Sequence, residues 1–194
     1  MDSSNKHIIA TAPVVFYEQA IPDKLLDLMI EELPKYTKDF ADANVGLENQ
    51  GQLNKYVRSS KTAWIYENDW VSSIFSHYFH IANKYVWEYD LNGIQSIQIT
   101  KYNENDYYTW HSDYGTASDN RYTRKLSATV LITDPSEYEG GDLEFIDYHN
   151  KVRAATRKKG TMIIFDSRIP HRVTPVTKGE RISLVSWMVG PKLR

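Results

Sequence analysis

The sequence contains no cysteine, which excludes disulfide frameworks, cysteine-bound zinc and thiol nucleophiles, so any metal must be held by histidine and carboxylate side chains. No apolar run approaches the roughly 18–20 residues that span a bilayer, and residues 1–6 do not begin a hydrophobic leader. Neither sign of charge is in excess, because 23 Lys and Arg residues stand against 25 Asp and Glu. We therefore expect a cytoplasmic protein with no membrane partner.

The first half of the chain predicts two helices and a long loop. Apolar residues with helical spacing follow Asp23, which can cap a helix that Pro34 is expected to end. A second helical pattern covers residues 68–85. Between them, residues 35–55 are polar and contain turn-forming residues, which predicts a long loop or loose hairpin that handles substrate.

After Gly93 the sequence changes to short strand-like runs separated by Gly and Pro turn signals. These runs are residues 94–102, 126–133, 142–148, 161–166 and 181–189. The pattern predicts an α+β protein with a double-stranded β-helix (jelly roll) core at about residues 93–190. Helical support and a substrate loop would occupy about residues 13–92, so that residues 1–194 form a single domain of ordinary size.

Two histidines and an aspartate could form a metal site. His111 and Asp113 are two residues apart, so in an extended strand both side chains leave the same face, about 6–7 Å apart at the backbone. His171 comes from a distant segment and would complete two imidazoles and one carboxylate, the ligand set that leaves open positions on a non-haem Fe(II). The His-x-Asp pair alone is a weak signal, since six histidines among 25 acidic residues produce such pairs by chance.

An arginine makes the metal hypothesis stronger. Arg181 opens the last strand-like run and, by the period-two rule, shares one face with Ser183, Val185 and Trp187. If that face points inward, a guanidinium is directed into the core, where an unpaired charge costs several kcal/mol. An anion must then meet it, and a guanidinium fork is shaped to bind a carboxylate. We expect this anion to be a cosubstrate.

These residues resemble the Fe(II)- and 2-oxoglutarate-dependent dioxygenases, in particular the prolyl 4-hydroxylase-like branch and its PKHD-type relatives. That branch has the pattern Tyr-x-x-Gly-x-x-Tyr-x-x-His-x-Asp, and here Asn105 stands in the glycine position. Asn tolerates the left-handed conformation, so the turn is expected to survive. The residues that fit the pattern are Tyr102, Tyr108, His111 and Asp113. Further similar segments are residues 58–60, 64, 126–129, 134–135, 138–143 and 171–177.

The resemblance implies a metal centre and a cosubstrate clamp. His111, Asp113 and His171 would hold Fe(II), which would bind 2-oxoglutarate and O2. The distal carboxylate of 2-oxoglutarate would pair with Arg181. Ascorbate (vitamin C) is implied as a reductant of this oxidoreductase.

The resemblance also implies a pocket around the cosubstrate and a type of reaction. Tyr102 would donate a hydrogen bond to 2-oxoglutarate, while Val173 and Trp187 would wall its pocket. Asp113 favours hydroxylation, because halogenating relatives replace this carboxylate with a small residue. Nucleic-acid demethylases of the wider superfamily usually carry a second arginine where this chain has Trp187, so a nucleic-acid substrate is disfavoured.

The function expected from these observations is hydroxylation of a peptidyl side chain, with proline favoured and with release of succinate and CO2. A peptide or protein would be the substrate partner. Two alternatives stay open. One is hydroxylation of a free amino acid or small metabolite on the same scaffold, and the other is a non-catalytic, cupin-like metal-binding module, which would need the three ligands but not Arg181.

Three other features have simpler explanations. His77 and His80 are three apart on the second predicted helix and could share a metal, but partial exposure on an amphipathic helix explains them better. The basic run at residues 153–159 fits a solvated hairpin better than an RNA-binding patch. Residues 114–125 could close over substrate or form a simple connection.

Overall fold

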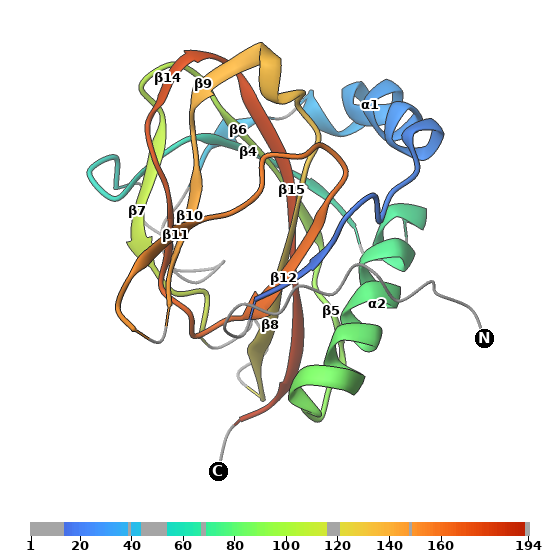
Figure 1. Cartoon of the computed structure of the whole chain (residues 1–194). Coiled ribbons are helices and arrows are strands. Elements are labelled where there is room, and N and C mark those ends of the chain that lie inside the picture. The colour runs from blue at the N-terminus through green and yellow to red at the C-terminus, as the bar shows by residue number, and fades with distance from the viewer. Residues whose placement is uncertain are drawn as a thin grey trace, which may run out of the picture.

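The computed structural model describes residues 14–38, 40–43, 54–66, 69–115, 121–147 and 149–192. Two helices, α1 (Asp23–Thr37) and α2 (Trp70–Ala82), lie side by side against one face of the larger of two main sheets (Figure 1). A single π-helical turn, η1 (Asn83–Trp87), extends α2. None of the described helices combines the length and apolar character needed to cross a bilayer.

The larger sheet has eight antiparallel strands among the described residues and forms the middle layer of the molecule. Seven of these strands follow one another in the order β1 (Val14–Tyr17), β12 (Met162–Asp166), β8 (Tyr122–Leu131), β15 (Arg181–Pro191), β6 (Ile97–Tyr102), β4 (Lys61–Ile65) and β2 (Ala41–Asp42). The eighth strand, β5 (Gly93–Ile94), pairs with β15.

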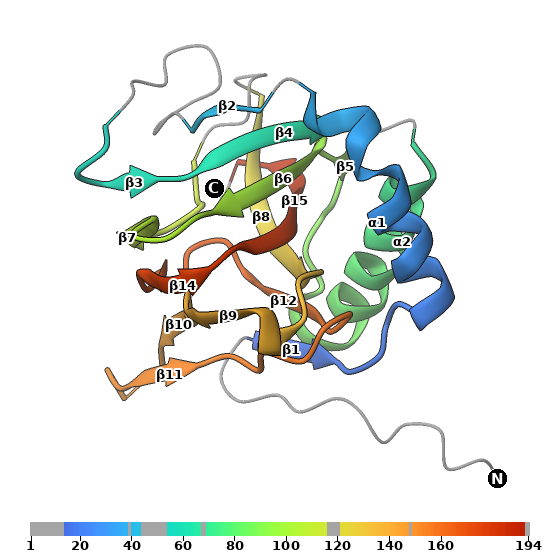
Figure 2. The ribbon, with the colours of Figure 1, turned by 90° about the horizontal axis from the view of Figure 1, so that it is seen from above.

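The smaller sheet lies on the side of the larger sheet opposite the helices, so that helices, larger sheet and smaller sheet form successive layers (Figure 2). A 3₁₀ turn, η2 (Pro135–Glu137), leads into a separate two-stranded ribbon of β9 (Tyr138–Gly140) and β14 (Val176–Gly179). The order in the smaller sheet is β11 (Val152–Ala154), β10 (Leu143–Ile146), β13 (His171–Val173), β7 (Tyr107–His111) and β3 (Arg58–Ser59). The fold is therefore the predicted α+β double-stranded β-helix with supporting helices.

The main hydrophobic core fills the space between the two helices and the larger sheet. Phe75 and Phe79 of α2 are fully buried there against aliphatic side chains of β6, β8 and β15. Burying each of these rings contributes about 1.5–3 kcal/mol relative to exposure. This layer covers one face of the larger sheet, and the other face lines the space between the two main sheets.

Helix α1 differs from the prediction at both ends. The N-cap residue is Pro22, whose carbonyl accepts hydrogen bonds from Leu25 N and Leu26 N, whereas Asp23 is the first helical residue. Asp23 still acts favourably there, because a carboxylate near a helix N-terminus interacts with the helix dipole. Pro34 lies inside the helix, which continues to Thr37. The prediction that Pro34 ends the helix was wrong by one turn.

The strand predictions agree with the observed order but not with every boundary. The run at 94–102 is split into β5 and β6, because Gln95 and Ser96 interrupt the strand. The second helix begins at Trp70, with Asp69 accepting a hydrogen bond from Val71 N. Much of the predicted substrate loop, at residues 44–53, and part of the segment 114–125, at 116–120, lie outside the described residues.

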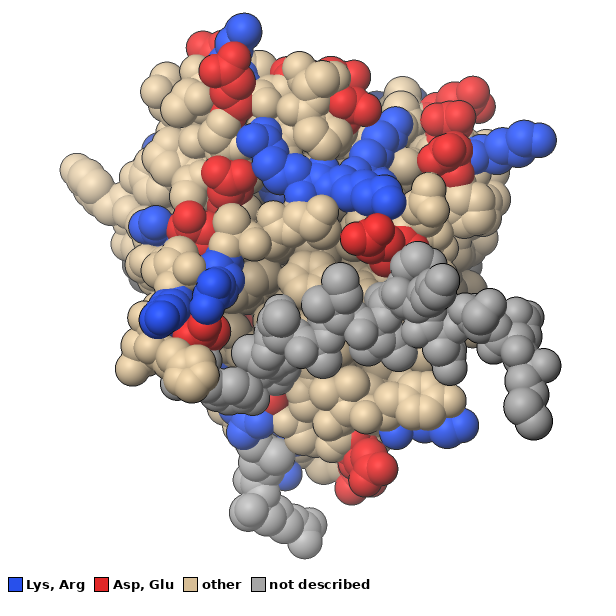
Figure 3. All heavy atoms as spheres, in the orientation of Figure 1, with Lys and Arg blue, Asp and Glu red and all other residues tan. Residues whose placement is uncertain are grey.

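Charged side chains of both signs lie next to one another on the face shown in Figure 3. The basic run at 153–159 begins in the hairpin of β10 and β11, as predicted, and its side chains have acidic neighbours. Arg153 Nε lies 3.1 Å from an Asp147 carboxylate oxygen, and Lys158 Nζ lies 3.1 Å from a Glu18 carboxylate oxygen. Exposed pairs of this kind contribute about 0–1 kcal/mol each.

Candidate active site

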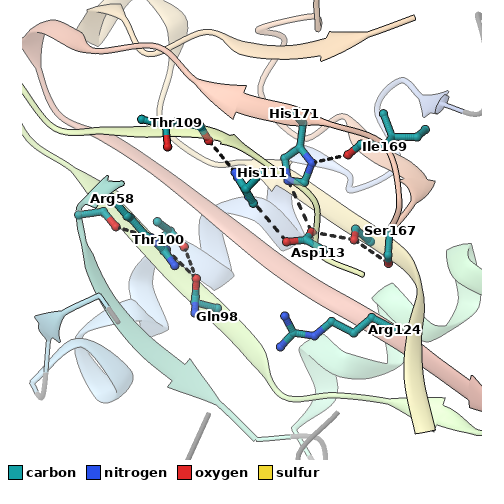
Figure 4. Close-up of polar contacts among 12 residues, drawn as sticks. Arg58, Gln98, Thr100, Thr109, His111, Asp113, Arg124, Ser167, Ile169 and His171 are labelled. Atoms are coloured by element: carbon teal, nitrogen blue, oxygen red, sulfur yellow. Dashed lines mark hydrogen bonds and ion pairs between the residues drawn. The ribbon is translucent and has the colours of Figure 1, made fainter. Parts of the chain in front are cut away.

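His111 and His171 come from neighbouring strands of the smaller sheet. His111 is the last residue of β7 and His171 the first of β13, and the two stand opposite each other in the antiparallel register. Asp113 completes the group (Figure 4). Its two carboxylate oxygens lie 3.7 Å from His111 Nε2 and 3.6 Å from His171 Nε2. One ligand atom from each of the three residues lies within 4.8 Å of the others, so one cation can contact all three.

Backbone carbonyls fix the protonation pattern of both imidazoles. His111 Nδ1 lies 2.8 Å from Thr109 O, and His171 Nδ1 lies 2.9 Å from Ile169 O. A carbonyl can only accept, so each Nδ1 must carry the proton and donate it. In the neutral form of either ring the lone pair is then on Nε2, which faces Asp113. This second contact of each ring is typical of histidine ligands in metal sites.

Asp113 lies beyond the end of β7, so the expectation that it shares an extended strand with His111 was wrong. One hydroxyl group donates to its carboxylate instead, and a second hydroxyl group supports the first. Ser127 Oγ donates a hydrogen bond of 2.8 Å to Asp113 Oδ2. Ser127 has only one hydroxyl proton, so the 2.9 Å contact between Ser127 Oγ and Ser167 Oγ must be donated by Ser167. The side chain of Asp113 is 9% exposed.

The environment shifts the pKa of two of these groups in the direction that metal binding needs. Burial, followed by the neighbouring His171, lowers the pKa of His111 from 6.5 to about 3. Burial alone would raise the pKa of Asp113, but His171 and His111 outweigh it and lower the pKa to about 2. At neutral pH the metal-free site therefore presents a neutral His111 and an ionised Asp113.

Aromatic rings hold the two imidazoles in place. The ring of Tyr108 stacks on that of His111, with 3.5 Å between centroids and 14° between planes. Phe165 of β12 meets the ring of His171 edge-on at 4.8 Å. The imidazoles are thus packed on one side and hydrogen-bonded on another, which leaves them little freedom to rotate.

Arg181 is buried at the start of β15, directly opposite Tyr102 of β6. One terminal nitrogen donates to Ser183 Oγ at 3.0 Å, and the guanidinium carbon lies 5.5 Å from the Tyr102 ring centroid. Its buried Nε has no hydrogen-bond partner among the described residues. An unpaired donor on a buried cation is costly, so the geometry is suited to an incoming anion.

A cavity of about 550 Å³ joins the arginine to the three candidate metal ligands. All seven site residues predicted from the sequence line it, and it lies between the two main sheets. Alternate residues of two strands of the larger sheet point into this cavity. They are Gln98, Thr100 and Tyr102 of β6 and, on β15, the predicted face from Arg181 to Trp187. Val173 forms part of the wall contributed by the smaller sheet.

Sequence analysis missed several residues that shape this site. Arg58 and Gln98 line the cavity, and Ser127 and Ser167 support Asp113 from behind it. Gln98 was not among the expected site residues, and Arg58 and Ser127 were included only as parts of the segments similar to the family. His77 and His80, by contrast, are exposed on α2 and do not line this cavity.

The turn before His111 behaves as expected. Asn105, which replaces the glycine of the related pattern, has a φ of 68° and adopts the left-handed conformation. Its backbone N–H donates to Val176 O at 2.8 Å. The turn therefore keeps its shape without glycine, because Asn is one of the few residues that tolerate this conformation.

In a comparison with known protein families, residues 97–189 match the sequence model of the 2OG-Fe(II) oxygenase superfamily. A PKHD-type hydroxylase of Gloeothece citriformis is 33% identical over 95 residues, which cover 49% of this chain and 43% of that protein. A PKHD-type hydroxylase of Hyphomonas neptunium is 39% identical over 87 residues, covering 44% of this chain and 38% of that protein. The chain thus matches less than half the length of each relative.

Solved structures share the fold over nearly the whole chain. A Pseudomonas putida prolyl-4-hydroxylase superposes with a TM-score of 0.73 at 18% identity, covering 94% of this chain and 95% of that one. A Trichoplax adhaerens prolyl hydroxylase, solved with a peptide fragment of the hypoxia inducible factor oxygen degradation domain, gives 0.74 at 18% identity, with coverage of 92% and 84%.

Proposed function

Residues 97–189 match the 2OG-Fe(II) oxygenase superfamily, and from that premise we propose that the chain is an Fe(II)- and 2-oxoglutarate-dependent hydroxylase. The observation that carries the proposal is the meeting, in one cavity, of a His-Asp-His cluster and a buried arginine whose Nε has no partner in the described part of the chain. The first feature suits a metal, and the second suits the anionic end of a cosubstrate.

His111, Asp113 and His171 would hold the iron. The donor set fits Fe(II), because two neutral imidazoles and one carboxylate leave positions open for other ligands. When bound, Fe(II) and 2-oxoglutarate supply the activation of O2, with succinate and CO2 as coproducts. The chain's own residues position the metal ligands and keep water away from them. Backbone carbonyls orient the two imidazoles, and aromatic rings packed against them exclude water.

Arg181 would bind the distal carboxylate of 2-oxoglutarate with its Nε and a terminal nitrogen. Tyr102 lies opposite it in the sheet, so a hydroxyl contact from Tyr102 to the same cosubstrate is part of the proposal. Val173 and Trp187, both buried in the cavity wall, would shield the cosubstrate from water. This use of Arg181 favours an oxygenase over a cupin-like module that only binds metal.

A peptidyl side chain is the proposed substrate, with proline favoured. It is supported by the fold shared with a prolyl hydroxylase that was solved with a peptide fragment. A free amino acid or small metabolite is the second candidate, favoured by the charge of the cavity described below. Ascorbate as reductant, a cytoplasmic location and a single-domain organisation stay predictions.

Anaerobic calorimetric titration of 2-oxoglutarate into the protein, with and without Fe(II), tests the function. We expect binding that needs the metal and that weakens about a hundred-fold in Arg181→Ala, because a bidentate ion pair and a buried donor are lost. Arg153→Ala, which removes an exposed arginine of β11, is the matched control and should bind normally. Equal affinity in Arg181→Ala and the parent would contradict the proposed clamp.

A further inference from the structure

A second buried arginine faces the same cavity and has no acidic partner in the described part of the chain. Arg58 of β3 is 7% exposed. Its Nε donates to Ser60 Oγ at 2.8 Å and its Nη2 donates to Gln98 Oε1 at 2.8 Å, and both acceptors are neutral. Among the residues that the structure describes, no carboxylate lies within 4.0 Å of this guanidinium. The guanidinium therefore donates hydrogen bonds, but no described carboxylate neutralises its positive charge.

The charges of the other cavity residues do not provide an internal counter-ion for Arg58. Asp113 would be used by the metal, and the distal carboxylate of 2-oxoglutarate by Arg181. Asp42, at the rim, lies 3.3 Å from Lys55 Nζ. With the metal and cosubstrate bound, the described residues of the cavity would leave no carboxylate to neutralise Arg58.

Arg58 is also close to the place where the chemistry would occur. Its guanidinium carbon lies 4.8 Å from the centroid of the Tyr108 ring, and that ring stacks directly on His111. Figure 4 shows Arg58 reaching Gln98 on one side of the space below the His-Asp-His cluster, with Arg124 pointing into that space from the other side. A ligand held by Arg58 would therefore lie beside the ring that stacks on His111, one of the candidate metal ligands.

The position of Arg58 separates it from the cosubstrate clamp. Gln98, which contacts Arg58, and Tyr102, which faces Arg181, are four residues apart on β6, or about 13 Å along an extended strand. The two arginines therefore lie near opposite ends of β6. A cosubstrate anchored by Arg181 leaves Arg58 available to a different molecule.

We propose that the substrate to be hydroxylated carries a carboxylate, and that Arg58, with Gln98 beside it, binds this group next to the metal. The inference rests on the hydroxylase function proposed above and narrows its substrate class. A buried guanidinium is stabilised most by an anion, and its fork matches a carboxylate with two parallel hydrogen bonds. The carboxylate belongs to a free amino acid or related small acid, to a peptide C-terminus, or to an acidic side chain beside the target residue.

Matched acid and amide probes test the proposal. Three sets of probes are titrated anaerobically into protein loaded with 2-oxoglutarate and Mn(II), with isothermal calorimetry as readout. They are free amino acids and their carboxamides, peptides with free or amidated C-termini, and end-capped peptides with internal Asp and Glu or Asn and Gln. We expect the acids of one set to bind about ten- to a hundred-fold more tightly than its amides, the range for a charge-assisted contact. The responding set identifies the source of the carboxylate.

Variants separate recognition from support of the fold. Arg58→Gln should abolish the difference between acids and amides, Arg58→Lys should restore part of it because the charge is kept, and Arg153→Gln should leave it unchanged. Arg58→Gln should also keep the parent's affinity for 2-oxoglutarate within about three-fold, since Arg181 binds that molecule.

Two results would overturn the inference. One is that no acid binds more tightly than its amide in the parent. The other is that Arg58→Gln weakens metal or cosubstrate binding but leaves the preference for acids intact, which would make Arg58 a support for Tyr108 only. Failure of the parent to bind 2-oxoglutarate at all would instead contradict the proposed function.

Discussion

The substitution Ser127→Ala tests how much one hydrogen bond to Asp113, a candidate metal ligand, contributes to metal binding. Ser127 and Ser167 are both fully buried, and Ser127 passes a hydrogen bond of 2.8 Å to Asp113 Oδ2 while receiving one of 2.9 Å from Ser167. Alanine removes one donor from the carboxylate and leaves the Ser167 hydroxyl without its partner. The carboxylate then has one contact fewer to hold it in the direction of the two imidazoles.

The size of the effect follows from the charge on the acceptor. A hydrogen bond to an ionised group contributes about 1.5–3 kcal/mol, and loss of an outer partner of a metal ligand typically costs about 10–100-fold in metal affinity. We expect Ser127→Ala to weaken Fe(II) binding by about that factor. Loss of the donor should also raise the pKa of Asp113 from about 2. Anaerobic competition with a chelating indicator measures the affinity directly.

Ser186→Ala is the matched control. Ser186 is fully buried in the same sheet, but its hydroxyl donates to Gln95 O at 3.1 Å and not to a candidate ligand. Both variants should lose about 1–2 kcal/mol in urea unfolding, as expected for one lost buried hydrogen bond. The reasoning would be refuted if Ser127→Ala lost stability to the same extent as Ser186→Ala but bound Fe(II) as tightly as the parent.

Two further predictions concern pH and backbone conformation. Because the pKa of His111 falls from 6.5 to about 3 on folding, the unfolded chain binds a proton between these values that the folded, metal-free chain does not, so stability is lost as pH falls. The loss should be about 2 kcal/mol between pH 6.5 and 5 in urea unfolding of chelator-treated protein, present in His77→Gln but absent in His111→Gln. Gly141→Ala should cost at least 1–2 kcal/mol and weaken 2-oxoglutarate binding, since Gly141 has a φ of +63° and a new Cβ would lie 3.0 Å from Arg181 Cδ. Gly93→Ala, with nothing within 4 Å of its Cβ, should leave both measurements within error, and a loss in Gly93→Ala equal to that in Gly141→Ala would contradict this explanation.

Much of the fold was predictable because β6 and β15 follow the period-two rule. Arg181 and Trp187 were expected to share an inward face, and both line the cavity. The left-handed turn at Asn105 was likewise predicted from its residue type. These features depend on local backbone geometry, which one sequence specifies directly.

Features that depend on packing between distant segments were not predictable. β3 has two residues and β13 has three, too few for a periodic pattern, so the strands that carry Arg58 and His171 could not be identified from periodicity. The Ser127–Ser167 contact joins residues that are 40 positions apart. Pro34 was expected to stop α1, but the helix continues to Thr37, because proline removes only its own N–H and the backbone N–H groups of residues 35–37 remain available to continue the helix.

The pairing of His111 with His171 across β7 and β13 makes strand alignment part of the chemistry. Because alternate residues of a strand face opposite sides, sliding β13 by one position would turn the His171 side chain away from Asp113. The register of these strands already shifts between His171 and Val173, so their alignment is not enforced by a long regular ladder. A metal held by both histidines would therefore act as a clasp between the two strands, and only the chain aligned in this way could hold it.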